Sequence, residues 1–462
     1  KMGYDKRSDS DDNGHRVDAM VNVPLGDSAA LRAVIFDTSA AGYVDRTIAP
    51  VLDDQNSESS QGGRLSVLWV NDALSIQGTY YTASSETEGS FMGDKLYEDS
   101  LNYRIPGLVP IMEEEIDIFS LDVDYEFDFA TLELTASNME RESYQLGEFP
   151  GGVAAFYDWF IQFNVLTRAA DRPDEMPTML AEGWTYDLAD TAGGPNQTGF
   201  NVDDMASSDR STFGARLVSS GDSNIEWLAG VFIKDSDDYR RNVQPQDYRP
   251  HLADATFTKS VYNVFYSDPS NTHEDTLDEK SVFGEFTYSL NEAWDLTLGL
   301  RYTDMEQMID DGRGTTEDKI WSPKFTLAWQ ATDETLAYFN ISTGFRPGNI
   351  NLGQEFNMRQ LGAAGDEVIP STPFAGNPLE LTGTEAAALA GSRMTYEGDS
   401  VTNYELGLKT RLADNRVQLT GSLYYFDWED TILLFADQNI PSINRNYMDN
   451  AGAAHSQGIE VG

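Results

Sequence analysis

The side chains of this 462-residue sequence that could do chemistry suit binding better than catalysis. Histidine occurs at His15, His251, His273 and His455, and no two of them have the spacing of a metal-binding pair. The sequence contains no glycine-rich phosphate loop followed by Lys–Ser/Thr and no nucleophile turn of the Gly-x-Ser-x-Gly type. The acidic run 235–238 lacks the spacing and the glycine of a calcium-binding loop. The sequence therefore predicts neither an enzyme nor a resident cofactor or metal, and it leaves open whether acidic loops bind Ca²⁺.

The candidate ligand-contacting residues are polar or aromatic and lie in long, irregular segments. Arg346, Asn349 and Asn351 surround a Pro-Gly pair that follows a segment of alternating apolar and polar residues. They could hydrogen-bond a ligand at the mouth of a sheet, or the Arg-Pro-Gly sequence could simply form the turn that ends a strand. Aromatic rings in other loops could stack on sugars or ring systems, or could pack the loops against themselves. The ring candidates are Tyr97, Tyr103 and Trp159.

Composition excludes several classes of protein. The chain has 77 acidic and 31 basic residues, a net charge of −46, so nucleic acid is a poor partner. The acidity is spread along the chain, which indicates a global adaptation, as to salt, rather than a local cation site. Cysteine is absent, which leaves no disulfide framework to predict. Mean hydropathy is −0.44, and no apolar run reaches the roughly 18 residues that a membrane-spanning helix requires.

Apolar and polar residues alternate with a period of two in many segments. Between Trp294 and Tyr302 every second residue is apolar, with an aromatic ring at each end of the row, and the residues between them include Asp295, Thr297 and Arg301. Such alternation predicts a strand with one apolar and one polar face. A soluble sandwich alternates too. The aromatic ends of the apolar rows and the charged residues on the opposite face favour a transmembrane β-barrel.

Turn signals divide the chain into about sixteen strands of an all-β, antiparallel transmembrane β-barrel. The predicted strands are 1–8, 14–25, 30–42, 63–70, 74–85, 115–127, 130–144, 207–220, 225–242, 280–290, 294–307, 320–330, 335–345, 401–411, 416–434 and 453–462. Short links alternate with much longer ones, the longest being Gln145–Ala206. Tight turns at one end and long loops at the other are typical of outer-membrane barrels.

Several motifs, in one order along the chain, resemble the β-barrel of TonB-dependent outer-membrane receptors. The resemblance rests on the segments NVPLGDSAALR (Asn22–Arg32), YFNISTGFRPGNIN (Tyr338–Asn351), VTNYELGLKT (Val401–Thr410), SLYYFDW (Ser422–Trp428) and NAGAAHSQGIEV (Asn450–Val461). It implies a barrel of about 22 strands, of which about 16 are present in residues 1–462. It also implies a plug domain, absent from this sequence, and an energy-coupling protein that acts on that plug.

In the resembled family, charged residues on the inner face of the barrel contact the plug. The resemblance gives this role to the inward-facing residues Glu285, Arg301, Lys324, Glu405, Lys409 and Arg411. The alternative is that these residues form a solvated wall. We expect the chain, which begins without an export signal and ends within a strand, to be an internal part of a longer protein of the bacterial outer membrane.

The resemblance implies a receptor for energy-coupled uptake of a scarce solute. The candidates are a ferric siderophore, haem, cobalamin or an oligosaccharide, and the sequence does not choose among them. Two other functions remain possible at this point. One is a passive, porin-like diffusion channel, and the other is a secreted, acidic, calcium-dependent surface β protein.

Overall fold

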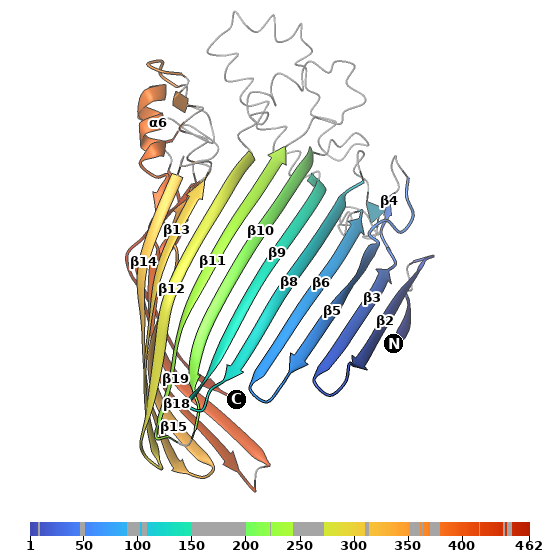
Figure 1. Ribbon diagram of the computed structural model, residues 1–462. Coiled ribbons are helices and arrows are strands. Elements are labelled where there is room, and N and C mark those ends of the chain that lie inside the picture. The colour runs from blue at the N-terminus through green and yellow to red at the C-terminus, as the bar shows by residue number, and fades with distance from the viewer. Residues whose placement is uncertain are drawn as a thin grey trace, which may run out of the picture.

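The chain folds into one antiparallel sheet of sixteen strands (Figure 1). The computed structural model describes residues 1–7, 10–46, 51–89, 102–103, 109–149, 200–221, 223–243, 272–309, 314–351, 354, 358, 361–362, 364–369, 379–414, 416–437, 439–440 and 446–462. The strands, in their order across the sheet, are β1 (Met2–Lys6), β2 (Asn13–Pro24), β3 (Ala29–Ala40), β5 (Glu58–Val70), β6 (Leu74–Glu88), β8 (Ile111–Glu126), β9 (Ala130–Phe149), β10 (Phe200–Ser219), β11 (Ile225–Val243), β12 (Thr272–Asn291), β13 (Trp294–Ile309), β14 (Gly314–Thr332), β15 (Thr335–Arg346), β18 (Asp399–Leu412), β19 (Val417–Glu429) and β22 (Ala454–Val461).

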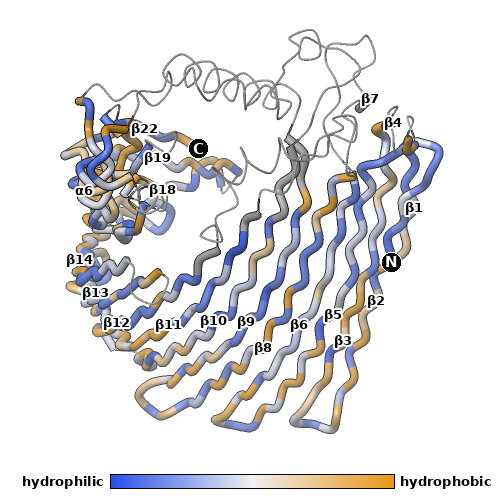
Figure 2. The backbone as a smooth tube through the Cα atoms, turned by 90° about the horizontal axis from the view of Figure 1, so that it is seen from above, coloured by the Kyte–Doolittle hydropathy of each residue, from blue (hydrophilic) through white to orange (hydrophobic). Residues whose placement is uncertain are grey.

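The sheet curves into an open arc, with β1 and β22 at its two edges (Figure 2). In the described part of the chain, each of these edge strands pairs with one neighbour only. Tight turns join the strands at one end, and the smaller elements gather at the other, where helix α6 lies (Figure 1). These elements are β4 (Asp45–Arg46), β7 (Asn102–Tyr103), β16 (Asn349–Ile350), β17 (Thr395–Tyr396), α6 (Gly383–Gly391), β20 (Ile432–Ala436) and β21 (Asn446–Asn450). No helix in the described ranges is both long and apolar enough to cross a membrane.

One face of the sheet is apolar and uncovered. Leu298 lies opposite Phe286 on β12 and Phe325 on β14, and its side chain is 47% exposed. Rings lie at both ends of the apolar row of β13: Trp294 stacks on Trp329 with ring centroids 5.5 Å apart, and Tyr302, in the middle of the strand, contacts Trp321. Only nine hydrophobic residues of the described part are buried, so no second layer covers these rows as it would in a sandwich.

The polar face is the concave one. Side chains converge there closely enough to bridge strands that are not neighbours: Lys324 of β14 reaches Glu285 of β12 across β13. The guanidinium of Arg301 on β13 likewise lies 5.7 Å from the ring centroid of Phe232 on β11. The two-faced, single-layer sheet that the alternation predicts is therefore confirmed, with the polar side turned inward.

The sixteen predicted strands and their antiparallel order are confirmed, but several strands are longer at the loop end than predicted. β8 begins at Ile111 rather than 115, β9 continues to Phe149, and β10 begins at Phe200 rather than 207. In these extensions apolar and polar residues no longer alternate, as in Ile111-Met112-Glu113-Glu114 and Asp203-Asp204-Met205-Ala206. Beyond the apolar band both faces meet water, so the apolar–polar alternation ends there although the hydrogen-bonded ladder continues.

The prediction of one strand over 416–434 is wrong. β19 ends at Glu429, because Asp430 adopts a positive φ of 53° that turns the chain. The apolar run that follows forms β20, which pairs with β21 in a separate hairpin. Periodicity could not separate these two strands, since only Glu429, Asp430 and Thr431 stand between the last ring of β19 and the continuous apolar run of β20.

Candidate functional site

The inner wall of the sheet carries an ion pair that skips a strand. Lys324 Nζ lies 2.7 Å from Glu285 Oε2, and Gly299 of β13 lies between them. A Cβ atom at Gly299 would lie 3.3 Å from Lys324 Cβ and 3.4 Å from Glu285 Oε2. The absence of a side chain at this position therefore leaves the space through which the two charges meet.

Arg301 is the centre of a second inner-wall cluster. The Arg301 Nη2 group donates one hydrogen bond to Glu279 Oε1 and one to Ser281 Oγ, both at 2.9 Å. The guanidinium also lies 5.5 Å from the ring centroid of Phe283 and near the ring of Phe232. These contacts fix a cation halfway along β13, where the alternation predicts an inward-facing charge.

The remaining predicted wall residues lie together on β18. Glu405 accepts a hydrogen bond from Tyr338 Oη of β15, and Lys409 Nζ lies 5.7 Å from the centroid of the Tyr338 ring. Arg411 is exposed two residues further along the same face. The structure thus brings the six predicted wall residues onto one surface, whereas their contact with a plug stays a prediction.

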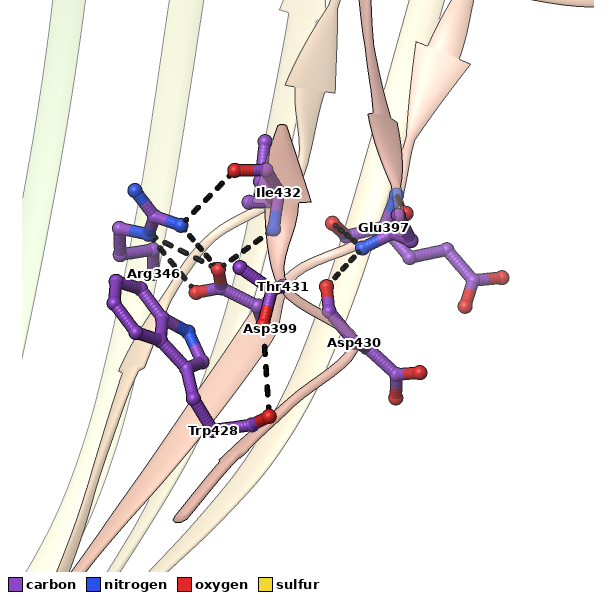
Figure 3. Close-up of polar contacts among 8 residues, drawn as sticks. Arg346, Glu397, Asp399, Trp428, Asp430, Thr431 and Ile432 are labelled. Atoms are coloured by element: carbon purple, nitrogen blue, oxygen red, sulfur yellow. Dashed lines mark hydrogen bonds and ion pairs between the residues drawn. The ribbon is translucent and has the colours of Figure 1, made fainter. Parts of the chain in front are cut away.

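A buried acid joins the strands to the outer loops. Asp399 is only 3% exposed. Its carboxylate accepts hydrogen bonds from Arg346 Nε, at 3.0 Å to Oδ1 and 3.1 Å to Oδ2, and from Arg346 Nη2. It also accepts the backbone N–H of Ile432 at 3.0 Å (Figure 3). The Arg346 guanidinium stacks over Trp428, 4.7 Å from the ring centroid. This junction joins the ends of β15, β18 and β19 to the start of β20.

Asn349 lies in β16 and Asn351 directly after it, and both side-chain amides accept hydrogen bonds from loop backbone. Asn349 Oδ1 accepts the N–H of Ile350, its own neighbour in sequence. Asn351 is 8% exposed, and its amide bonds the backbone of Met448 and Arg393. In this structure all three polar candidates, Arg346 included, organise the loops; a direct contact with a ligand stays a prediction.

Tyr97 and Trp159 lie outside the described residues. Tyr103 lies in β7, which pairs in parallel with β4, and only its backbone is described. The proposed stacking of these three rings on a ligand therefore stays a prediction as well.

Helix α6 stands at the loop end and begins with a capping box. Thr382 Oγ1 accepts the N–H of Glu385, and the Glu385 carboxylate accepts the N–H of Thr382 at 2.9 Å. The Thr382 hydroxyl also donates to the Glu385 carboxylate at 2.9 Å. The two hydrogen bonds that this carboxylate accepts from Thr382, the backbone one first, hold the pKa of Glu385 below its usual value. Nearby, burial raises the pKa of the Tyr396 phenol, and the Arg346 charge partly opposes that effect.

The sequence interpretation missed Asp399, Trp428 and Ile432 as members of the Arg346 junction. The one available signal was at Asp399, two residues before the predicted strand 401–411, whereas Trp428 and Ile432 lie inside the single strand predicted over 416–434. Arg346 and Asp399 are 53 residues apart in sequence, and only the pairing of β15 with β18 places them side by side. Nowhere in the described ranges do three or more His, Asp or Glu side chains form a group that could hold a metal ion.

Solved structures with the same fold are outer-membrane receptors. The ferric yersiniabactin uptake receptor FyuA of Yersinia pestis superposes with a TM-score of 0.61 at 14% identity, over 100% of this chain and 57% of that one. FpvA of Pseudomonas aeruginosa, solved with a bound iron–pyoverdine complex, gives 0.63 at 11% identity, over 97% and 51%. The ferric preacinetobactin receptor BauA of Acinetobacter baumannii gives 0.58 at 14% identity, over 97% and 57%. The chain thus spans little more than half the length of these receptors.

The sequence itself matches a protein family over most of its length. No curated protein matches it significantly. Residues 74–462 match the family described as "TonB dependent receptor-like, beta-barrel". This match covers the inner wall, the Arg346 junction and the outer loops described above. Together with the single two-faced sheet, it shows that the chain belongs to the TonB-dependent receptors of the bacterial outer membrane and forms part of their β-barrel.

Proposed function

We propose that this chain supplies the barrel wall and outer loops of a receptor for energy-coupled uptake of a scarce solute. The observation that carries the proposal is the single sheet with an uncovered apolar face and an ion-paired concave face. A wall of this kind separates hydrocarbon from a water-filled lumen. Family members are transport receptors rather than enzymes, which supports a role in binding and transport.

The inner-wall residues suit contact with a folded plug domain. Glu285, Arg301, Lys324 and Glu405 lie on the concave face and are held in place by partners on the wall. Fixed charges lose less side-chain entropy when a rigid partner docks than mobile ones do. The plug, and an inner-membrane coupling protein that acts through the plug's N-terminal segment, are the partners that this proposal requires.

A ferric siderophore is the favoured solute. The three solved receptors above are described as siderophore receptors, which supports this class over haem, cobalamin or an oligosaccharide. The net charge of −46 disfavours direct passage of a polyanion, because a field of one sign repels solutes of the same sign. A neutral or weakly charged ferric complex is the best candidate.

Uptake assays on the full-length receptor test the proposal. The receptor is expressed in a bacterium that lacks its own iron-siderophore receptors, and radioactive iron is supplied as a hydroxamate, a catecholate or a citrate complex. Haem, cobalamin and maltodextrin are tested as alternative solutes. We expect saturable uptake of one solute that disappears when the coupling protein is deleted. Uptake that survives this deletion would show a passive channel, and extraction of the protein into water without detergent would show a secreted surface protein.

A further inference from the structure

Two outer loops of this chain form a single body. The first outer loop, residues 347–398, contains β16, β17 and α6; the second outer loop, residues 430–453, contains β20 and β21. β15, β18 and β19 are consecutive in the sheet, so the two loops leave it at neighbouring positions. Their described residues are joined at the base, in the middle and along one side.

The base of the pair is the Asp399 junction. Asp399 holds Arg346, the last residue of β15, through a two-pronged ion pair, and with the same carboxylate it accepts the N–H of Ile432 in the second outer loop. Arg346 Nη2 in turn lies 3.5 Å from the carbonyl oxygen of Ile432. One buried carboxylate therefore sets the positions at which both loops leave the sheet (Figure 3).

The middle of the pair is held by Asn351. Its Oδ1 accepts the N–H of Met448 at 2.7 Å, and its Nδ2 donates to the carbonyl oxygen of Met448 at 2.8 Å. The same Nδ2 donates to the carbonyl oxygen of Arg393 at 2.9 Å. The side chain thus takes the place of a strand residue beside β21, and both polar atoms of its amide are engaged.

Further contacts continue along the same boundary. The backbone N–H and carbonyl of Glu397 bond the side chain of Asn450 at 2.9 and 3.0 Å. Arg393 forms an ion pair with the buried Asp437 and lies 4.5 Å from the ring centroid of Tyr447. Each contact crosses from the first outer loop to the second, and several involve side chains shielded from water. Breaking one partner of a shielded contact leaves a polar group unsatisfied, so the loops separate only at a cost in free energy.

We infer that the two outer loops act as one preformed wall beside the solute's entry path, with Asp399 and Asn351 as the positioning residues that keep the loops in register. The inference rests on the proposed function only in assigning a solute to that path. The coupling of the loops is a property of the receptor without any ligand. A solute that displaces either loop must then displace both.

Distances between the loops test this inference in the full-length receptor in detergent. The sequence has no cysteine, so cysteines introduced at Ala388 on α6 and Leu434 on β20, both exposed, can carry the nitroxide labels for electron–electron double resonance. We expect one narrow distance distribution in the parent. Asp399→Asn keeps the shape but loses the charge, and Asn351→Asp keeps the acceptor but loses both donated bonds. Each variant should broaden the distribution, and the double variant should broaden it most.

Controls separate this result from failed folding and from a failed functional proposal. Glu317→Gln removes a charge from an exposed pair on β14 and should leave the distribution narrow. A folded barrel is verified by the change of its electrophoretic mobility on heating. If Asp399→Asn does not fold, Arg346→Lys removes the two-pronged geometry and retains the charge. A distribution that stays narrow in the folded double variant would overturn the coupling, whatever the uptake assays show. Loss of all uptake in the parent would overturn the proposed function alone.

Discussion

Single residues on the inner wall set how closely neighbouring strands approach. Four aromatic side chains lie across a glycine directly opposite in the next strand: Phe36 over Gly62, Phe283 over Gly230, Tyr338 over Gly407 and Tyr424 over Gly458. A Cβ atom at Gly407 would lie 2.1 Å from the Tyr338 ring. Each ring therefore lies over the backbone of the glycine opposite, where any side chain larger than hydrogen would displace it.

Gly407→Ala should destabilise the receptor. The methyl group has no space beneath the Tyr338 ring, so the ring must leave its contacts with Glu405 and Lys409. Overpacking of this kind costs about 1–3 kcal/mol. The free energy of unfolding in urea, measured in detergent, gives the value. Gly78→Ala is the matched control, because nothing lies within 4 Å of a Cβ atom there.

A double variant distinguishes steric conflict from a general effect of alanine. In the double variant Tyr338→Ala/Gly407→Ala the conflicting ring is gone. Its loss of unfolding free energy should therefore be clearly smaller than the sum of the losses in the two single variants. Strict additivity would show that the ring and the glycine do not interact.

At the scale of elements, one residue decides where β19 ends. Asp430 has a φ of 53°, a conformation that β-branched residues adopt only with strain. Asp430→Val should therefore cost about 1–2 kcal/mol of stability and weaken the turn that separates β19 from β20. Glu429→Val, one residue earlier in the regular strand, is the control. Equal stability of the two variants in urea unfolding would contradict the assigned role of the turn.

The start of α6 should depend on pH. Because hydrogen bonds from Thr382 lower the pKa of Glu385, the charged capping box stabilises the helix above the ordinary pKa of a glutamate, and that stabilisation is lost as pH falls through the lowered value. A nitroxide at Ala388 should become more mobile on acidification below about pH 4. Glu385→Gln keeps a capping acceptor but cannot titrate, so its label mobility should not change over this range. An identical response in both proteins would exclude Glu385 as the cause.

The strands were predictable from the sequence, whereas the loop contacts were not. Alternation in 294–307 and 401–411 identifies both the strand and the face, since a sheet between lipid and water imposes a period of two. The inward positions of Glu285 and Lys324 follow from that period alone. The contacts of Asp399 and Asn351 do not, because they join segments 33 to 97 residues apart through irregular backbone. No local pattern records such pairings.

At the scale of the whole molecule, the acidic charge forms rows across strands. On the outward face, beyond the apolar band, Asp235 lies opposite Asp278, Asp278 opposite Glu306, and Glu306 opposite Glu317. Four neighbouring strands thus carry like charges side by side. Directly opposed like charges destabilise a sheet by roughly 0.2–1 kcal/mol a pair. The acidity predicted as a global property is therefore also an ordered one, and it should make the fold sensitive to salt.

Raising the salt concentration should stabilise the barrel. The screening length falls from about 10 Å at 0.1 M to about 3 Å at 1 M ionic strength, which is shorter than the spacing between opposed strands of about 5 Å. The urea midpoint of unfolding in detergent should rise over this range. Asp278→Asn relieves two repulsive pairs, so it should raise the midpoint at low salt and make the midpoint depend less on salt.

Asp304→Asn is the control with the opposite expected effect, because Asp304 lies between Lys280 and Lys319 and its neutralisation leaves these two cations without the acid between them. That variant should be less stable at low salt. Should both variants shift the midpoint in the same direction, the rows of charge do not govern the salt response.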